Sequence, residues 1–117
     1  MYHMAIVKDI LLNVMGGVKK IRIQQIYYIE GQNRMLHYHT DEGTFSVRGT
    51  MKSVVAELAK YPFAKCNHWY IVNLMHVTEI KKNIVVVGGH ELEISRRNHA
   101  SFIHALAEYI EGPDKEY

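Results

Sequence analysis

"NIVVVGGHELEIS", residues 83–95, is the stretch that decides the fold. Two short apolar runs flank Gly88 and Gly89, and glycines accept the positive φ angles that a two-residue hairpin turn requires. In the second run Leu92 and Ile94 alternate with charged or polar residues, which is the period of a strand with one buried face. The stretch therefore predicts an antiparallel hairpin.

Short strands and tight turns extend through most of the chain. Asp41, Glu42 and Gly43 form a second connection typical of a hairpin. Thr50 is a good N-cap for the first of two segments whose apolar residues recur at helical spacing. The predicted order is β-β-β-β-α-β-β-β-β-α, so we expect a mainly β fold of short antiparallel strands. The clearest segments are strands at 18–23, 26–30, 35–40, 44–49, 83–87 and 90–95, and helices near 50–60 and 97–110.

The chain has 117 residues, enough for one domain with one modest core. We expect a lead-in segment at 1–17, a domain at 18–110 and a frayed acidic tail at 111–117, because Gly112 and Pro113 stop the preceding helix. The tail holds three acidic residues and one Lys, so the rest of the chain carries a net charge of +4. This charge gives a mild preference for a polyanion as partner.

Composition also indicates a compartment. The single Cys rules out an internal disulfide and fits a reducing environment. No run approaches the 18 apolar residues of a membrane span, and the N-terminus has no secretory signal. We therefore expect a cytoplasmic protein.

The segment "SRRNH", residues 95–99, lies where a strand gives way to a helix. Arg96 and Arg97 fall in the first helical turn, where the helix dipole favours acidic residues instead. A phosphate or a base edge outside the protein would compensate for this unfavourable placement. The alternative is that these arginines pair with Glu91 or Glu93.

A second polar cluster opens the stretch "FAKCNHWYIVNL", residues 63–74. Lys65, Asn67 and His68 precede a strand, whereas the pair Asn33 and Arg34 occupies a turn between two strands. Together with the arginines after residue 95, these donors form three polar strand ends that we expect along one edge of the sheets. Arg, Asn and His read base edges, and Lys and Arg hold phosphates.

The chain resembles the LytTR family of bacterial DNA-binding domains from about Val18 to Ile110. The resemblance lies in "IYYIEGQNRMLHYHT", "FSVRGTMKSVVAEL", "FAKCNHWYIVNLMHVTEI" and "ELEISRRN". It implies an elongated stack of short antiparallel sheets with flanking helices. It also implies that loops enter successive major grooves of double-stranded DNA, at tandem direct repeats, to regulate transcription.

The resemblance further implies roles for single residues. The base-reading residues would be Asn33 or Arg34 in the first loop, His68 in the second and Arg97 in the third. In this chain the first turn is short, His68 replaces the Arg or Asn of many relatives, and Trp69 replaces a small polar residue. Phosphate or supporting contacts would come from Lys65, Asn67, Arg96 and Asn98.

The family also implies partners. Its members are usually attached to a phosphorylatable receiver domain, and some stand-alone relatives are encoded beside a membrane protein that restrains them. The chain is thus expected to be an excised output domain or a stand-alone regulator. A second copy on the same DNA is a further expected partner, and no small-molecule substrate or cofactor is expected.

Two other function classes remain open from the residues alone. A small hydrolase or metal enzyme would use Cys66 with His68, or the pair His37 and His39, although no third ligand or orienting acid is evident. A protein-interaction module would use Trp69 and its neighbour Tyr70 as a contact patch. We expect neither a catalytic residue nor a bound metal.

Overall fold

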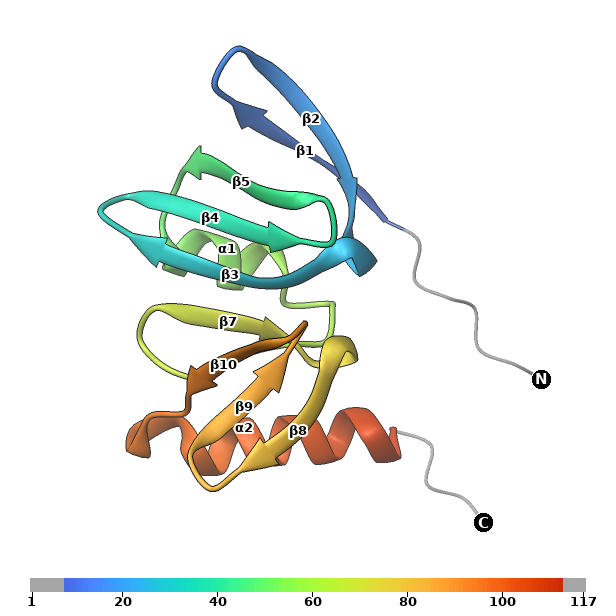
Figure 1. Ribbon diagram of the computed structural model, residues 1–117, viewed down its shortest axis with the longest axis vertical. Helices are drawn as coiled ribbons and strands as arrows, with labels where there is room; N and C mark the ends of the chain where they lie inside the picture. The colour runs from blue at the N-terminus through green and yellow to red at the C-terminus, as the bar shows by residue number, and fades with distance from the viewer. Residues whose placement is uncertain (1–7, 113–117) are drawn as a thin grey trace, which may run out of the picture.

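The computed structural model describes residues 8–112. They form ten strands in three antiparallel sheets, two α-helices and two short 3-10 helices (Figure 1). The molecule is elongated, with principal extents of 50 × 37 × 25 Å, and its sheets are stacked along the long axis. This architecture confirms the predicted mainly β fold with two helices. No helix within residues 8–112 is long and apolar enough to cross a membrane.

The central element is a five-stranded sheet in the order β5-β4-β3-β7-β6. Its strands pair antiparallel throughout, and the predicted Asp41–Glu42 turn joins β4 to β5. The helix α1 follows β5, begins at the N-cap Thr50 and packs beside this sheet. The elements are β3 (Ile26–Gln32), β4 (Met35–Thr40), β5 (Gly43–Arg48), α1 (Met51–Glu57), β6 (Phe63–Lys65) and β7 (Tyr70–Asn73).

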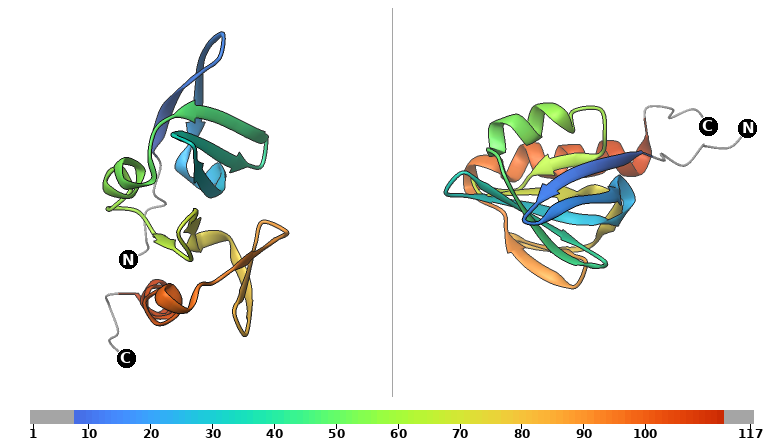
Figure 2. Two further views of the ribbon diagram at one scale, coloured as in Figure 1. Left: turned by 90° about the vertical axis from the view of Figure 1, so that its left-hand side faces the viewer. Right: turned by 90° about the horizontal axis from the view of Figure 1, so that it is seen from above.

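A smaller sheet lies on each side of the central one (Figures 1 and 2). The predicted Gly88–Gly89 turn joins β9 to β10, and both glycines have positive φ, 56° and 82°. The helix α2 follows β10 and ends at Gly112, as predicted. The remaining elements are β1 (Asp9–Val14), β2 (Gly17–Arg22), η1 (Ile23–Gln25), η2 (Leu74–His76), β8 (Val77–Lys81), β9 (Ile84–Val87), β10 (His90–Glu93) and α2 (Arg96–Glu111).

The structure has two strands more than the predicted eight. One is β1, which lies within the segment interpreted as a lead-in and pairs with β2 along its whole length. The other arises because three strands, not two, lie between α1 and residue 83. Residues 1–7 and 113–117, including most of the predicted tail, lie outside the described residues, so the three-part division of the chain remains a prediction.

The central sheet separates two hydrophobic cores. Adjacent residues of one strand point to opposite faces, so Ile29 and Ile71 enter one core whereas Tyr28 and Val72 enter the other. The first core is closed by α1 and the β1–β2 hairpin, and the second by the three-stranded sheet and α2. One sheet therefore fixes the relative positions of all other elements.

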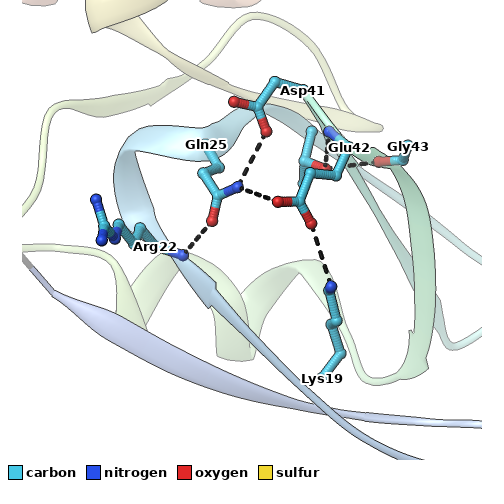
Figure 3. Close-up of polar contacts among 7 residues, drawn as sticks. Lys19, Arg22, Gln25, Asp41, Glu42 and Gly43 are labelled. Carbon is cyan, nitrogen blue, oxygen red and sulfur yellow. Dashed lines mark hydrogen bonds and ion pairs between the residues drawn. The ribbon is translucent and has the colours of Figure 1, made fainter.

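Polar contacts fix the corner between β2 and β3 (Figure 3). The Gln25 side chain accepts from the Arg22 amide at 2.9 Å and donates to Asp41 and Glu42, each at 3.1 Å. Lys19 forms an ion pair with Glu42 at 3.1 Å. These contacts attach the β4–β5 turn to the end of β2.

Asn73 is a fully buried polar residue at the end of β7. Its amide nitrogen donates to the Ile26 carbonyl at 2.9 Å, and its oxygen accepts from the Met75 amide at 3.1 Å. It thus attaches the start of η2 to the start of β3, between the two cores.

We expect Asn73→Ala to lower the free energy of unfolding by about 2–3 kcal/mol, because it leaves a buried carbonyl and a backbone amide without partners. Urea unfolding measures the change. The exposed residue Asn13 in β1 offers a control, since Asn13→Ala should change stability by less than about 0.5 kcal/mol. Equal effects of the two substitutions would contradict the role of Asn73.

His39 is a partly buried titratable residue on the central sheet. Its ring stacks on Tyr28, with ring centres 4.3 Å apart, and its Nε2 lies 3.3 Å from the Glu30 carboxylate. Burial lowers the pKa of His39 from its ordinary value of 6.5, and Glu30 opposes that shift. The folded protein therefore favours the neutral imidazole.

The unfolded chain consequently binds a proton at His39 at higher pH than the folded chain does. The free energy of unfolding should fall as pH decreases through about 6.5 and the loss should level off below the folded pKa. We expect His39→Gln to make the dependence shallower in urea unfolding between about pH 7.5 and 5.5. Identical pH dependence in both proteins would show that His39 does not contribute.

Candidate nucleic-acid interface

The first predicted loop is a tight turn between β3 and β4. Asn33 and Arg34 are its two central residues, both exposed, with φ of 54° and 61°. Positive φ at both positions characterises the hairpin turn whose twist matches its strands. Asn tolerates this conformation, whereas for Arg34 it is unfavourable. The turn therefore projects two polar side chains from the end of the hairpin.

The second loop, residues 66–69, connects β6 to β7. The Asn67 side chain is buried and engaged inside the protein: its nitrogen donates to the Glu93 carbonyl at 2.8 Å, and its oxygen accepts from the Trp69 amide at 2.7 Å. His68 and Trp69 are exposed beside it, with their rings edge to face. Asn67 therefore holds the loop in place, and His68 faces outward.

The third predicted region is the first turn of α2. Ser95 caps this helix by accepting from the Asn98 amide at 3.2 Å, and its hydroxyl donates to the Asn98 side chain at 2.9 Å. Arg96 and Arg97 are exposed, and within residues 8–112 neither has an ion pair. The alternative of a pair with Glu91 or Glu93 is wrong, because no ion pair among the described residues joins either acid to these arginines, and Glu91 instead pairs with Lys81 at 3.2 Å.

Backbone contacts hold the second and third regions together. The Ser95 amide donates to the Cys66 carbonyl at 2.9 Å, next to the bond between Asn67 and Glu93. The Gly31 amide donates to the Trp69 carbonyl at 2.8 Å and attaches the second loop to β3. The three regions consequently follow one another along the left-hand edge of the molecule in Figure 1, and the left panel of Figure 2 shows this edge face on.

We call this surface the basic edge; it comprises the β3–β4 turn, the β6–β7 loop with Lys65, and the first turn of α2. A hollow of about 480 Å³ separates its first two parts. Four residues predicted from the sequence line the hollow: Asn33, Arg34, Lys65 and His68. The structure thus brings together the predicted first and second loops.

Sequence reasoning missed Lys52, which lines the same hollow from α1. The available signal was its place in the first turn of a predicted helix, the same unfavourable position as that of Arg97 in α2. Across the described part of the chain, several other lysines are paired with acids, whereas Lys52 and Lys65 have no ion pair. Lys52 thus adds a further cation beside the hollow.

The residues proposed for a hydrolase or metal enzyme lie in separate surroundings. Cys66 is fully buried, and burial raises the pKa of its thiol to about 12, whereas a nucleophile needs a lowered pKa. His68 is exposed and does not form a pair with it. His37 contacts Ser46 at 2.6 Å, and His39 contacts Glu30. No group of three metal-binding side chains occurs among residues 8–112.

Comparisons with known proteins identify similar domains. The family model of the LytTr DNA-binding domain matches residues 16–107. Among solved structures, the chain is similar to one described as the LytTr DNA-binding domain of a methyl-accepting/DNA response regulator from Bacillus cereus. The TM-score is 0.75 at 18% identity, over 84% of this chain and 95% of that one. A search of curated proteins found no match.

The structural likeness supports the fold, and the family match covers nearly the whole stack of sheets. The match includes all three parts of the basic edge. The chain therefore belongs to the LytTR family of DNA-binding domains.

Proposed function

We propose that the protein binds double-stranded DNA along its basic edge and regulates transcription by recognising a specific sequence. Loops of this edge enter successive major grooves. The observation that carries this proposal is the alignment of the three donor-rich regions on one edge, with cations that have no ion pair among the described residues. The long axis of 50 Å exceeds the roughly 34 Å between successive grooves on one face of DNA.

The exposed side chains of the basic edge have two different roles toward DNA in this proposal. Arg97 and His68 are the base readers of the third and second loops, since Arg pairs with guanine through two hydrogen bonds and His offers a donor or an acceptor. Asn33 or Arg34 reads from the first turn. Lys65 and Arg96 contact phosphates.

Asn67 and Asn98 have supporting roles. Their side chains are engaged with Glu93 and Ser95. Each therefore positions exposed neighbours on its own loop or turn.

The wider setting is also part of the proposal. The DNA site contains tandem direct repeats, and a second copy of the protein occupies the neighbouring repeat. A receiver domain or a membrane-bound inhibitor controls access to DNA, and the protein acts in the cytoplasm. The family is one of DNA-binding domains and not of enzymes.

The test begins with selection of a preferred duplex from random DNA. We expect Arg97→Ala to weaken binding to this duplex by about 1–3 kcal/mol, with little change for random DNA, because it removes a bidentate base contact. Fluorescence anisotropy titrations on both duplexes measure the difference.

Lys65→Ala is the contrasting variant. It should weaken binding to both duplexes alike and lower the slope of log affinity against log salt by about one unit. Equal losses on both duplexes for Arg97→Ala would assign Arg97 to a phosphate. Wild-type binding without salt dependence would refute the proposed function itself.

A further inference from the structure

The geometry points to a specific role for the hollow in the basic edge: it receives a stretch of sugar–phosphate backbone between the first two loops, and Lys52 holds one of its phosphates. This inference rests on the proposed function and adds a contact from α1, outside the three loops.

The argument begins with the shape of DNA. Each groove of the duplex is bordered by raised sugar–phosphate backbone. A protein that inserts two neighbouring loops therefore needs an open space between them. The β3–β4 turn and the β6–β7 loop have such a space, because the hollow of about 480 Å³ is lined by Asn33 and Arg34 on one side and by Lys65 and His68 on the other.

The lining matches the chemistry of a nucleic-acid backbone. Met51 and Val55 contribute apolar surface, which suits the deoxyribose rings. The cationic side chains of Arg34, Lys52 and Lys65 surround it and suit the phosphates.

Local structure fixes Lys52 beside the hollow. The Gly49 amide donates to the Arg34 carbonyl at 2.9 Å and attaches the chain before α1 to the first turn. Thr50 then caps the helix by accepting from the Ser53 amide at 3.2 Å. A Cβ at Gly31 would lie 3.1 Å from Met51 Cε, so the absent side chain lets α1 pack closely against the sheet. Lys52 thus has a defined position although its side chain is exposed.

The direct test compares Lys52→Ala with Lys60→Ala, a matched control beyond the other end of α1 that lies away from the hollow. Lys52→Ala should lower the salt slope by about one unit and weaken binding about fivefold near 0.15 M salt, on selected and random duplexes alike. Lys60→Ala should match the wild type. Urea unfolding of each variant confirms that the fold is retained.

A second measurement locates the contact on the DNA. Single phosphates of the selected duplex are replaced one at a time by neutral methylphosphonates. The wild type should lose affinity at the linkage that lies in the hollow, and Lys52→Ala should lose nothing more there while remaining sensitive elsewhere.

The outcomes distinguish the role of Lys52 from the proposed DNA-binding function. If Lys52→Ala binds like Lys60→Ala while Lys65→Ala and Arg97→Ala are impaired, the role of Lys52 is refuted and the proposed function stands. The same holds if Lys52→Ala stays as sensitive as the wild type at every neutral linkage. Absence of salt-dependent DNA binding by the wild type would refute both.

Discussion

The geometry of the basic edge depends on the hydrogen bonds of the Asn67 side chain. This buried amide joins the Glu93 carbonyl at the end of β10 to the Trp69 amide just before β7. Without it, among the hydrogen bonds of residues 8–112, the loop that carries His68 would keep only the Ser95–Cys66 backbone bond to the segment that leads into Arg96 and Arg97. One short polar side chain therefore couples the central sheet to the start of α2.

The central sheet provides the frame for this contact. Because its two faces enter separate cores, α1 and α2 are both positioned by one set of strands. Loops that extend from such a frame can be short, as the two-residue turn at Asn33 and Arg34 shows. Short loops restrict the motion of their side chains, so less conformational entropy is lost when they bind a rigid partner.

Local patterns in the sequence were sufficient to predict several elements. The Gly88–Gly89 hairpin and the helix that ends at Gly112 depend on backbone preferences that neighbouring residues reveal. The strand β1 was missed because its apolar residues do not alternate in the sequence: Ile10, Leu11 and Leu12 are consecutive, although in the structure Leu11 is 68% exposed and Leu12 is buried. Its pairing with β2 was needed to define it as a strand.

The sequence indicated most residues of the candidate site, but not which of them face solvent and which support the loops from within. Arg97 and His68 stood out because such residues have no local use at a strand end or in a first helical turn. In contrast, the buried position of Asn67 and the place of Lys52 in the hollow depend on contacts with Glu93 and the β3–β4 turn, which are distant in sequence. An Asn in a polar cluster has the same sequence signal whether it faces solvent or supports the loop from within.

Amide chemical-shift mapping of the protein during titration with the selected duplex tests the central claim most directly. The account predicts that the largest changes follow the basic edge, at residues 33–34, 65–69 and 96–98, with a smaller group around Lys52. Residues at the C-terminal end of α2 and in the β1–β2 hairpin should change little. Largest changes on the His37 and His39 surface, or in that hairpin, would contradict recognition of DNA by the basic edge.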